Sequence, residues 1–256
     1  MTPLPPEFLT KPLAHRGLHD LSRGVLENSC AAFEAAIAGG YGIELDVQLT
    51  ADDHAVVFHD YRLDRMTPDT GLVRKHSRAE LAHIPLLGGS ETIPSLESVL
   101  ELVAGRTPLL IEIKDQDGAM MHDVGPLEIA VAKALQGYKG PVAVMSFNPH
   151  AVEVFAAAAP DVPRGLTTCA YQPADWPHLP DEVFAHLRDV PHYDRVGASF
   201  ISHLAQDLAR PRVAELKDQG AKVLCWTIRS QADEDTARKV AHNVTFEGYA
   251  AVVPAS

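Results

Sequence analysis

The amino-acid sequence predicts a parallel α/β fold, namely a (β/α)8 barrel (TIM barrel) with a short insertion after the second strand. Strand-like and helix-like segments alternate along the chain, which is typical of sheets with parallel strands. The chain has 256 residues and a hydrophobic content of 46%, and this is the usual size of one such barrel. Polar and charged residues recur near the ends of several expected strands, where barrels of this class carry their functional sites.

Eight main strands are expected, and each is a short apolar run bounded by turn-forming residues. They cover residues 12–15, 42–49, 109–114, 141–146, 164–169, 195–200, 221–226 and 244–247. A further short strand is expected directly after the second of these, at residues 55–58.

Helices are expected between the strands. The first has Asn28 as its N-cap and ends at Gly39-Gly40, because these residue types favour helix termini. The helices are expected at residues 29–38, 94–103, 125–136, 149–159, 182–189, 204–219 and 232–241.

Residues 61–92 are polar and rich in turns, so we expect a small insertion or lid there. Low-complexity segments and linkers are absent from the sequence, which predicts a single domain over residues 1–256. A doubly wound open sheet has the same alternation and is the alternative fold. However, the glycine-rich turn of a dinucleotide site is absent after the first strand, where His15-Arg16-Gly17 stands instead.

The formal net charge is −12, without a basic run. Binding to nucleic acid or to anionic lipid surfaces is therefore not expected. The three cysteines, Cys30, Cys169 and Cys225, are sparse and odd in number, which is typical of reduced thiols. Residues 1–11 carry no apolar signal segment, and no apolar run is long enough to span a membrane. We therefore expect a cytoplasmic protein without integral membrane association.

Two of the expected strands carry charge on one face. Side chains at positions i and i+2 of a strand share a face, so Glu44 and Asp46 lie together, as do Glu112 and Lys114. A buried parallel strand is normally apolar on both faces, and unpaired charge there is costly. These side chains are therefore expected to pair with each other or to hold a cation. A solvated face on an edge strand is the alternative.

Histidines stand at two further strand ends, in His15-Arg16 and His59-Asp60. Carboxylates that bind a metal ion, cations that hold a phosphate and two imidazoles that move protons together suit chemistry on a phosphate group. Hard carboxylate oxygens favour Mg2+ or Ca2+ over Zn2+.

These residues and their order resemble the glycerophosphodiester phosphodiesterase family, and the resemblance covers nearly the whole chain. The matching motifs are His-Arg-Gly (15–17), Glu-Asn-Ser (27–29), Glu-Leu-Asp-Val-Gln-Leu-Thr (44–50), Val-Val-Phe-His-Asp (56–60), Ile-Pro-Ser-Leu-Glu (93–97), Ile-Glu-Ile-Lys (111–114), Ser-Phe (146–147) and Trp-Thr (226–227). The resemblance implies a TIM barrel that hydrolyses glycerophosphodiesters to glycerol 3-phosphate and an alcohol, in lipid and glycerol metabolism.

The resemblance also assigns roles to individual residues. By match to the family motifs, the metal ligands for Mg2+ or Ca2+ would be Glu44, Asp46 and Glu112. The acid/base pair would be His15 and His59.

Four further residues are candidates for contact with the substrate. Arg16 and Lys114 would contact the phosphate by match to the family. Asn28 is a possible site contact, or serves only as the start of a helix. Trp226 is expected to pack on the glycerol or alcohol moiety, or to be plain core.

Two other functions are kept as alternatives. The first is a phosphodiesterase that acts on a lysophospholipid or a phosphoinositide. The second is a catalytically silent barrel used as a binding module, which would be expected to have lost a metal ligand or a histidine. The small-molecule glycerophosphodiester is the partner expected, and a homo-oligomer is left open.

Overall fold

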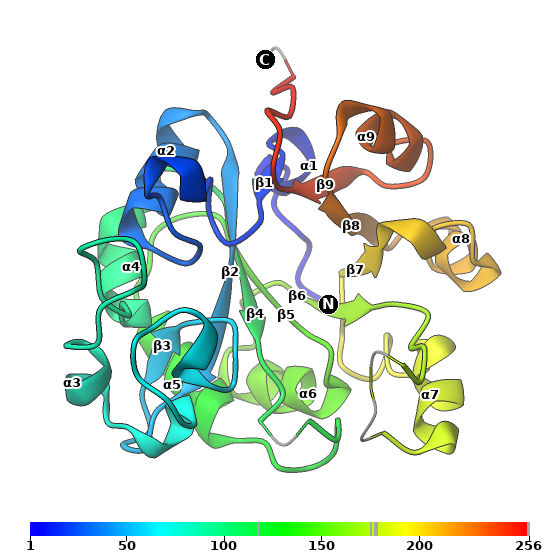
Figure 1. Cartoon of the computed structure of the whole chain (residues 1–256). Coiled ribbons are helices and arrows are strands. Elements are labelled where there is room, and N and C mark those ends of the chain that lie inside the picture. Colours follow the sequence, from blue (N-terminus) through cyan, green and yellow to red (C-terminus); the bar gives the residue numbers. More distant parts are fainter. Residues whose placement is uncertain (117, 175, 177–178, 255–256) are drawn as a thin grey trace.

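A computed structural model of the chain describes residues 1–116, 118–174, 176 and 179–254. Its nine-stranded sheet has the order β1-β9-β8-β7-β6-β5-β4-β2-β3. β1 pairs in parallel with both β9 and β2, so the parallel strands close into a barrel (Figure 1). The predicted (β/α)8 fold is therefore confirmed. β3 lies outside the ring and pairs antiparallel with β2.

The parallel strands and the helices alternate around the barrel. The strands are β1 (Leu13–Ala14), β2 (Gly42–Leu49), β3 (Ala55–Val57), β4 (Leu109–Ile113), β5 (Val142–Ser146), β6 (Arg164–Thr168), β7 (Phe200–Leu204), β8 (Lys222–Ile228) and β9 (Asn243–Phe246). The helices are α1 (Glu7–Thr10), α2 (Cys30–Ala38), α3 (Arg78–Leu81), α4 (Leu96–Val103), α5 (Pro126–Ala134), α6 (Pro149–Ala158), α7 (Asp181–Arg188), α8 (Pro211–Asp218) and α9 (Gln231–Ala237).

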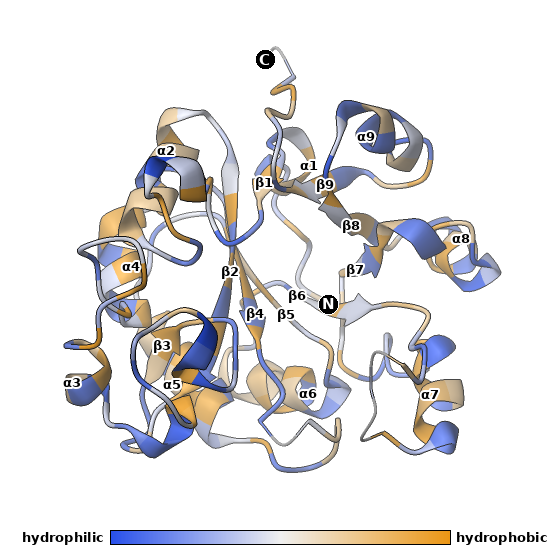
Figure 2. Cartoon of the chain, in the orientation of Figure 1, coloured by the Kyte–Doolittle hydropathy of each residue, from blue (hydrophilic) through white to orange (hydrophobic). Residues whose placement is uncertain are grey.

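A common apolar core lies between the outward faces of the strands and the helices α2, α4, α5, α6, α8 and α9. Its strand residues include Ile43, Leu45 and Val47 of β2, which alternate with the inward-facing charged residues. α7 and α8 carry both hydrophilic and hydrophobic residues (Figure 2), as expected of helices with one packed face. Among the described residues, no helix combines the length and the apolar character needed to cross a lipid bilayer.

Apolar side chains fill the end of the barrel at which the parallel strands begin. Phe8 of α1 and Leu13 of β1 are fully buried there with Leu110, Phe200 and their neighbours. Gly165 makes room for Phe200, because a Cβ atom at this position would lie 2.4–2.6 Å from the aromatic ring. This closed layer leaves the carboxyl ends of the strands as the open end of the barrel.

Residues 61–92 follow β3 and contain the short helical segments η2 (Leu63–Arg65), η3 (Val73–Lys75) and α3. They have a small apolar cluster of their own with β3, which includes Leu63, Val73 and Leu81. The segment is thus more regular than its turn-rich sequence suggests, because single apolar residues spaced along it are buried together.

Three details differ from the sequence expectations. The strand expected at 195–200 is β7, Phe200–Leu204, since Gly197 has a φ of +61° and belongs to a turn. The helix expected at 204–219 is divided into η4 (Ala205–Asp207) and α8, which begins at Pro211 because the residue before a proline disfavours helical backbone. The N-cap of α2 is Ser29, whose hydroxyl accepts a hydrogen bond from the amide of Ala32, and not Asn28.

Candidate active site

Three buried carboxylates converge inside the open end of the barrel. In the parallel register of β2 and β4, Asp46 lies beside Glu112, and Glu44 precedes Asp46 by two residues on the same inward face. Ligand oxygens of Glu44, Asp46 and Glu112 all lie within 4.8 Å of one another. Within the described part of the chain, this is the group of carboxylate, histidine and cysteine ligands that meets this distance criterion.

Two cations lie against these carboxylates. The Lys114 Nζ atom is 2.7 Å from Asp46 Oδ1 and 2.5 Å from Glu112 Oε1. The backbone amide of Arg16 donates a hydrogen bond of 3.0 Å to Glu44 Oε2, and Arg16 Nε lies 3.5 Å from Asp46 Oδ2. The carboxylates are therefore only partly neutralised by the side chains around them.

The electrostatics of the group are compatible with a bound cation. Burial, and then the negative charges of Asp46 and Glu112, raises the pKa of Glu44 well above its ordinary value. Burial also opposes ionisation of Asp46, yet the Lys114 ammonium holds the pKa of Asp46 well below its usual range. The pKa of Lys114 is raised by Asp46 and Glu112 against the effect of burial. Hard oxygens in a buried, electron-rich cluster of this kind fit Mg2+ or Ca2+.

His15 lies directly after β1 and is held by a carboxylate. Its Nδ1 atom is 2.5 Å from Glu247 Oε2, and its Nε2 atom is 4.0 Å from Glu44 Oε2. Glu247 is paired in turn with Arg229, at 2.6 Å. Burial lowers the pKa of His15, although the hydrogen bond with Glu247 opposes this. The contact orients the imidazole so that Nε2 faces the carboxylate group.

His59 is held in a similar way on the other side of the site. Its Nδ1 atom is 2.6 Å from Asp60 Oδ1. Asp60 accepts hydrogen bonds from Arg65, which also binds Glu27, and Glu27 accepts from Arg16. Burial opposes ionisation of Asp60, but the bonds from His59 and Arg65 keep its pKa well below the usual range. A chain of ion pairs thus runs from His59 to Arg16.

The loop between β1 and α2 has an uncommon backbone. Arg16 and Asn28 have φ values of +56° and +54°, and Gly17 has +81°. The amide of Asn28 donates to the carbonyl of Arg16 at 2.8 Å, and its side-chain Nδ2 donates to Asp46 Oδ2 at 2.9 Å. Positive φ in non-glycine residues often accompanies functional sites. Here it turns Asn28 toward the carboxylate rather than into a cap.

Apolar side chains form the opposite wall of the site. A cavity of about 490 Å³ is lined by His59, Glu112 and Lys114 on one side and by Met120, Phe147 and Trp176 on the other. Phe147 stacks edge-to-face on Trp226, with ring centroids 5.5 Å apart. Trp226 also donates from Nε1 to the carbonyl of Ser202 at 3.0 Å. Trp226 therefore supports Phe147 from behind and is not among the residues that line the cavity.

The mouth of the barrel thus has a charged half and an aromatic half. The charged half of the mouth comprises His15, Arg16, Glu44, Asp46, His59, Glu112 and Lys114. The aromatic half comprises Met120, Phe147, Tyr171, Trp176 and Trp226.

The structure brings the sequence-predicted residues of the charged half to one place. Asn28 contacts this group through its hydrogen bond to Asp46, and Trp226 belongs to the aromatic half. Glu247 and Asp60 were not predicted as partners of the two histidines. Asp60 follows His59 directly, so its adjacency was a usable signal. Glu247 is 232 residues from His15, and only closure of the barrel brings β9 beside β1.

Comparison with known proteins identifies relatives of this chain. The sequence model of the glycerophosphoryl diester phosphodiesterase family matches residues 15–244. A glycerophosphodiester phosphodiesterase of Caldanaerobacter subterraneus subsp. tengcongensis is 36% identical over 60% of this chain and 65% of its own length. Another, of Bacillus altitudinis, is 33% identical over 72% of this chain and 73% of its own length.

A solved structure shows the same architecture. It is a phosphodiesterase of Oleispira antarctica in complex with its product sn-glycerol-3-phosphate, and it superposes with a TM-score of 0.76. The two sequences are 25% identical, and the superposition covers 94% of this chain and 93% of that one.

Proposed function

Because the chain belongs to the glycerophosphoryl diester phosphodiesterase family, we propose that it hydrolyses glycerophosphodiesters to glycerol 3-phosphate and an alcohol in a reaction that depends on a divalent cation. The observation that carries the proposal is the convergence of Glu44, Asp46 and Glu112 within 4.8 Å at the open end of the barrel. The product found with the Oleispira antarctica phosphodiesterase supports the same substrate class.

Glu44, Asp46 and Glu112 would hold the cation, Mg2+ or Ca2+, between buried oxygens. When bound, the cation supplies positive charge that neutralises the phosphate. Lys114, which is paired with Asp46 and Glu112, would contact the phosphate with its ammonium group. Arg16 offers a planar guanidinium for the same group, and Glu27 fixes its orientation at 2.8 Å.

His15 and His59 form the proposed acid/base pair. Each is bonded through Nδ1 to a carboxylate, which leaves Nε2 to exchange a proton with the substrate or with water. One imidazole removes a proton from the nucleophile, and the other protonates the leaving alcohol oxygen. Asn28 would position Asp46 through its hydrogen bond. Tyr61 and Arg62 of the segment 61–92 line the cavity.

The test is release of glycerol 3-phosphate from glycerophosphocholine by the purified protein. We expect release with Mg2+ or Ca2+, loss of release with EDTA, and loss in a His15→Ala variant. A His83→Ala variant serves as the matched control, since His83 is an exposed histidine outside the site. Release that persists in EDTA after removal of bound metal would contradict the metal dependence.

The aromatic half of the mouth supports a second candidate substrate class. Met120, Phe147 and Trp176 offer an apolar surface beside the charged half, and such a surface suits the acyl chain of a lysophospholipid. Turnover of lysophosphatidylcholine and glycerophosphocholine should be compared under the same conditions. A higher kcat/KM for the lysophospholipid would favour this second class.

A further inference from the structure

Four histidines gather on the outer side of the aromatic half, away from the carboxylates. His122 lies in the loop after β4, His150 in the first turn of α6, His186 in the last turn of α7, and His192 in the turn that follows α7. The ring centroids of His122 and His150 are 3.9 Å apart, and those of His186 and His192 are 4.8 Å apart. The centroids of His150 and His192, which join the two pairs, are 6.0 Å apart.

We propose that this histidine cluster binds a borderline transition-metal ion, with Zn2+ as the reference ion, through His150, His186 and His192. The site would link α6, α7 and the turn after α7, and it would be separate from the carboxylate site. It requires no change in the proposed reaction.

The pair His186 and His192 is the preformed part of the site. Their Nε2 atoms face each other at 3.0 Å, whereas two imidazole nitrogens on a tetrahedral zinc ion at 2.0–2.1 Å stand about 3.3 Å apart. Without an ion, one ring must donate a proton to the other at this distance. An ion beside the line that joins the two nitrogens would satisfy both of them at nearly the same separation, once the rings turn toward it.

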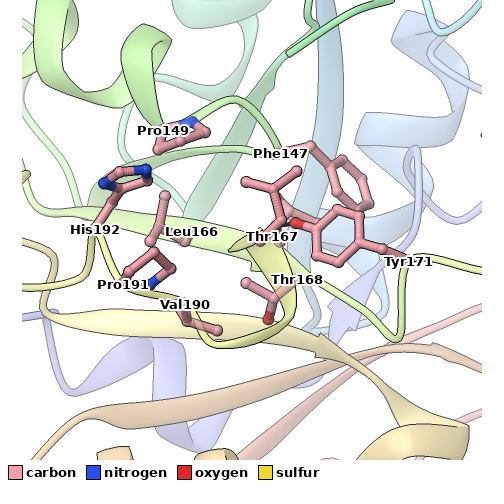
Figure 3. A pocket seen from close by; sticks show the side chains of 10 residues that line it. Phe147, Pro149, Leu166, Thr167, Thr168, Tyr171, Val190, Pro191 and His192 are labelled. Carbon is pink, nitrogen blue, oxygen red and sulfur yellow. Dashed lines mark hydrogen bonds between the residues drawn. The ribbon is translucent and has the colours of Figure 1, made fainter. Parts of the chain in front are cut away.

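A cavity of about 400 Å³ adjoins the pair and is lined by His150, His186 and His192 together with Glu182. His192 projects beside Pro149, the first residue of α6, on the side of a neighbouring pocket that is opposite to Phe147 and Tyr171 (Figure 3). Ligand nitrogens of His150, His186 and His192 do not all lie within 4.8 Å of one another in this structure, so the His150 side chain would have to turn toward the pair to become the third ligand. The Glu182 carboxylate and water are available as further ligands.

The charge of Arg195, which acts on both His150 and His192, is paired with Glu153 at 3.3 Å. This pairing limits the repulsion between Arg195 and a bound cation.

The test is isothermal titration of Zn2+ into the untagged full chain in saturating Mg2+, which occupies the carboxylate site. We expect one zinc ion to bind per chain, and the His186→Gln and His192→Gln variants to weaken that binding at least about tenfold. A His83→Gln variant is the matched control, because His83 is an exposed histidine outside the cluster. Zinc binding should leave the control unchanged.

The proposal is overturned if His186→Gln and His192→Gln bind Zn2+ as the wild type does, or if binding disappears only in a Glu112→Gln variant. A crystal of the wild-type protein soaked in Zn2+ provides a second measurement, which does not depend on whether the variants fold. We expect an anomalous peak between His186 and His192, and a peak confined to the carboxylates would also overturn the proposal.

Discussion

The two halves of the barrel mouth are built on different principles. The charged half holds buried carboxylates, a lysine and two histidines, each fixed by ion pairs and hydrogen bonds at 2.5–4.0 Å. The aromatic half is held by ring contacts, with Phe147 in contact with Tyr171, Trp176 and Trp226. One half therefore concentrates buried charge, which fits the proposed action on a phosphate, and the other concentrates apolar surface, which fits the proposed contact with the rest of the substrate.

The difference extends to stability. Buried charges contribute little net stabilisation, but removal of one partner leaves the others unpaired and is costly. Each aromatic contact buries apolar surface and stabilises the fold by about 0.5–1.5 kcal/mol beyond the effect of that burial. Substitutions of the buried charged residues are therefore expected to affect the reaction and the fold together, and those in the aromatic half to affect substrate affinity.

The largest expected effect is on the rate, from His59→Ala in the charged half. We expect kcat to fall by about 10²–10⁴, because a positioned acid or base contributes that much. The folded state should be affected little, since the His59 side chain is 32% exposed. Steady-state kinetics and a thermal melt test both expectations. A kcat near that of the wild type would remove His59 from the acid/base pair.

Lys114→Met is expected to have the largest effect on stability. Without divalent ions it should lower the free energy of unfolding by about 3–5 kcal/mol, because Asp46 and Glu112 would lose a buried cationic partner. Added Mg2+ should narrow the gap between the variant and the wild type. Urea denaturation with and without Mg2+ measures both quantities. A gap that is the same in Mg2+ would argue against a cation among these carboxylates.

Gly165→Ala tests the apolar layer beneath both halves. The added Cβ atom would meet the ring of Phe200 at 2.4–2.6 Å, and overpacking of this kind costs about 1–3 kcal/mol. The melting temperature should fall while kcat stays close to that of the wild type. A fall in kcat as large as that in His59→Ala would contradict this expectation and show that packing in the apolar layer affects the geometry of the site.

Trp176→Ala is expected to have the smallest effect, in the aromatic half. Loss of one aromatic contact, about 0.5–1.5 kcal/mol, should raise KM by roughly 2–12-fold and leave kcat unchanged. The effect should be greater for a substrate with a bulky apolar alcohol than for glycerophosphoethanolamine. KM values for both substrates provide the measurement. A fall in kcat instead would show that Trp176 affects the reaction step and not only substrate binding.

Most elements of the fold could be predicted from the order of apolar runs, prolines and glycines. The strand around residues 195–200 could not, because Val196, Ala198 and Phe200 form an apolar run whose first part is buried as a turn rather than as a strand. Asn28 illustrates the same limit. Its residue type favours a helix cap, but its contact with Asp46 depends on a neighbouring strand.

The candidate site was predictable where its residues share a strand. Alternation within β2 and β4 placed Glu44 with Asp46 and Glu112 with Lys114 on single faces, which follows from the two-residue period of a strand. The histidine cluster was not predictable, because His122, His150, His186 and His192 come from separate segments without common periodicity.

By itself, the sequence determined the alternation of strands and helices, the faces that carry charge, and the motifs that assign the family. These are local properties, set by side-chain periodicity and by residue types at strand ends. Tertiary structure alone decided the register that sets Asp46 beside Glu112, the contact of His15 with Glu247, and the gathering of aromatic rings opposite the charges. Those contacts depend on closure of the barrel, which brings together residues that no local pattern relates.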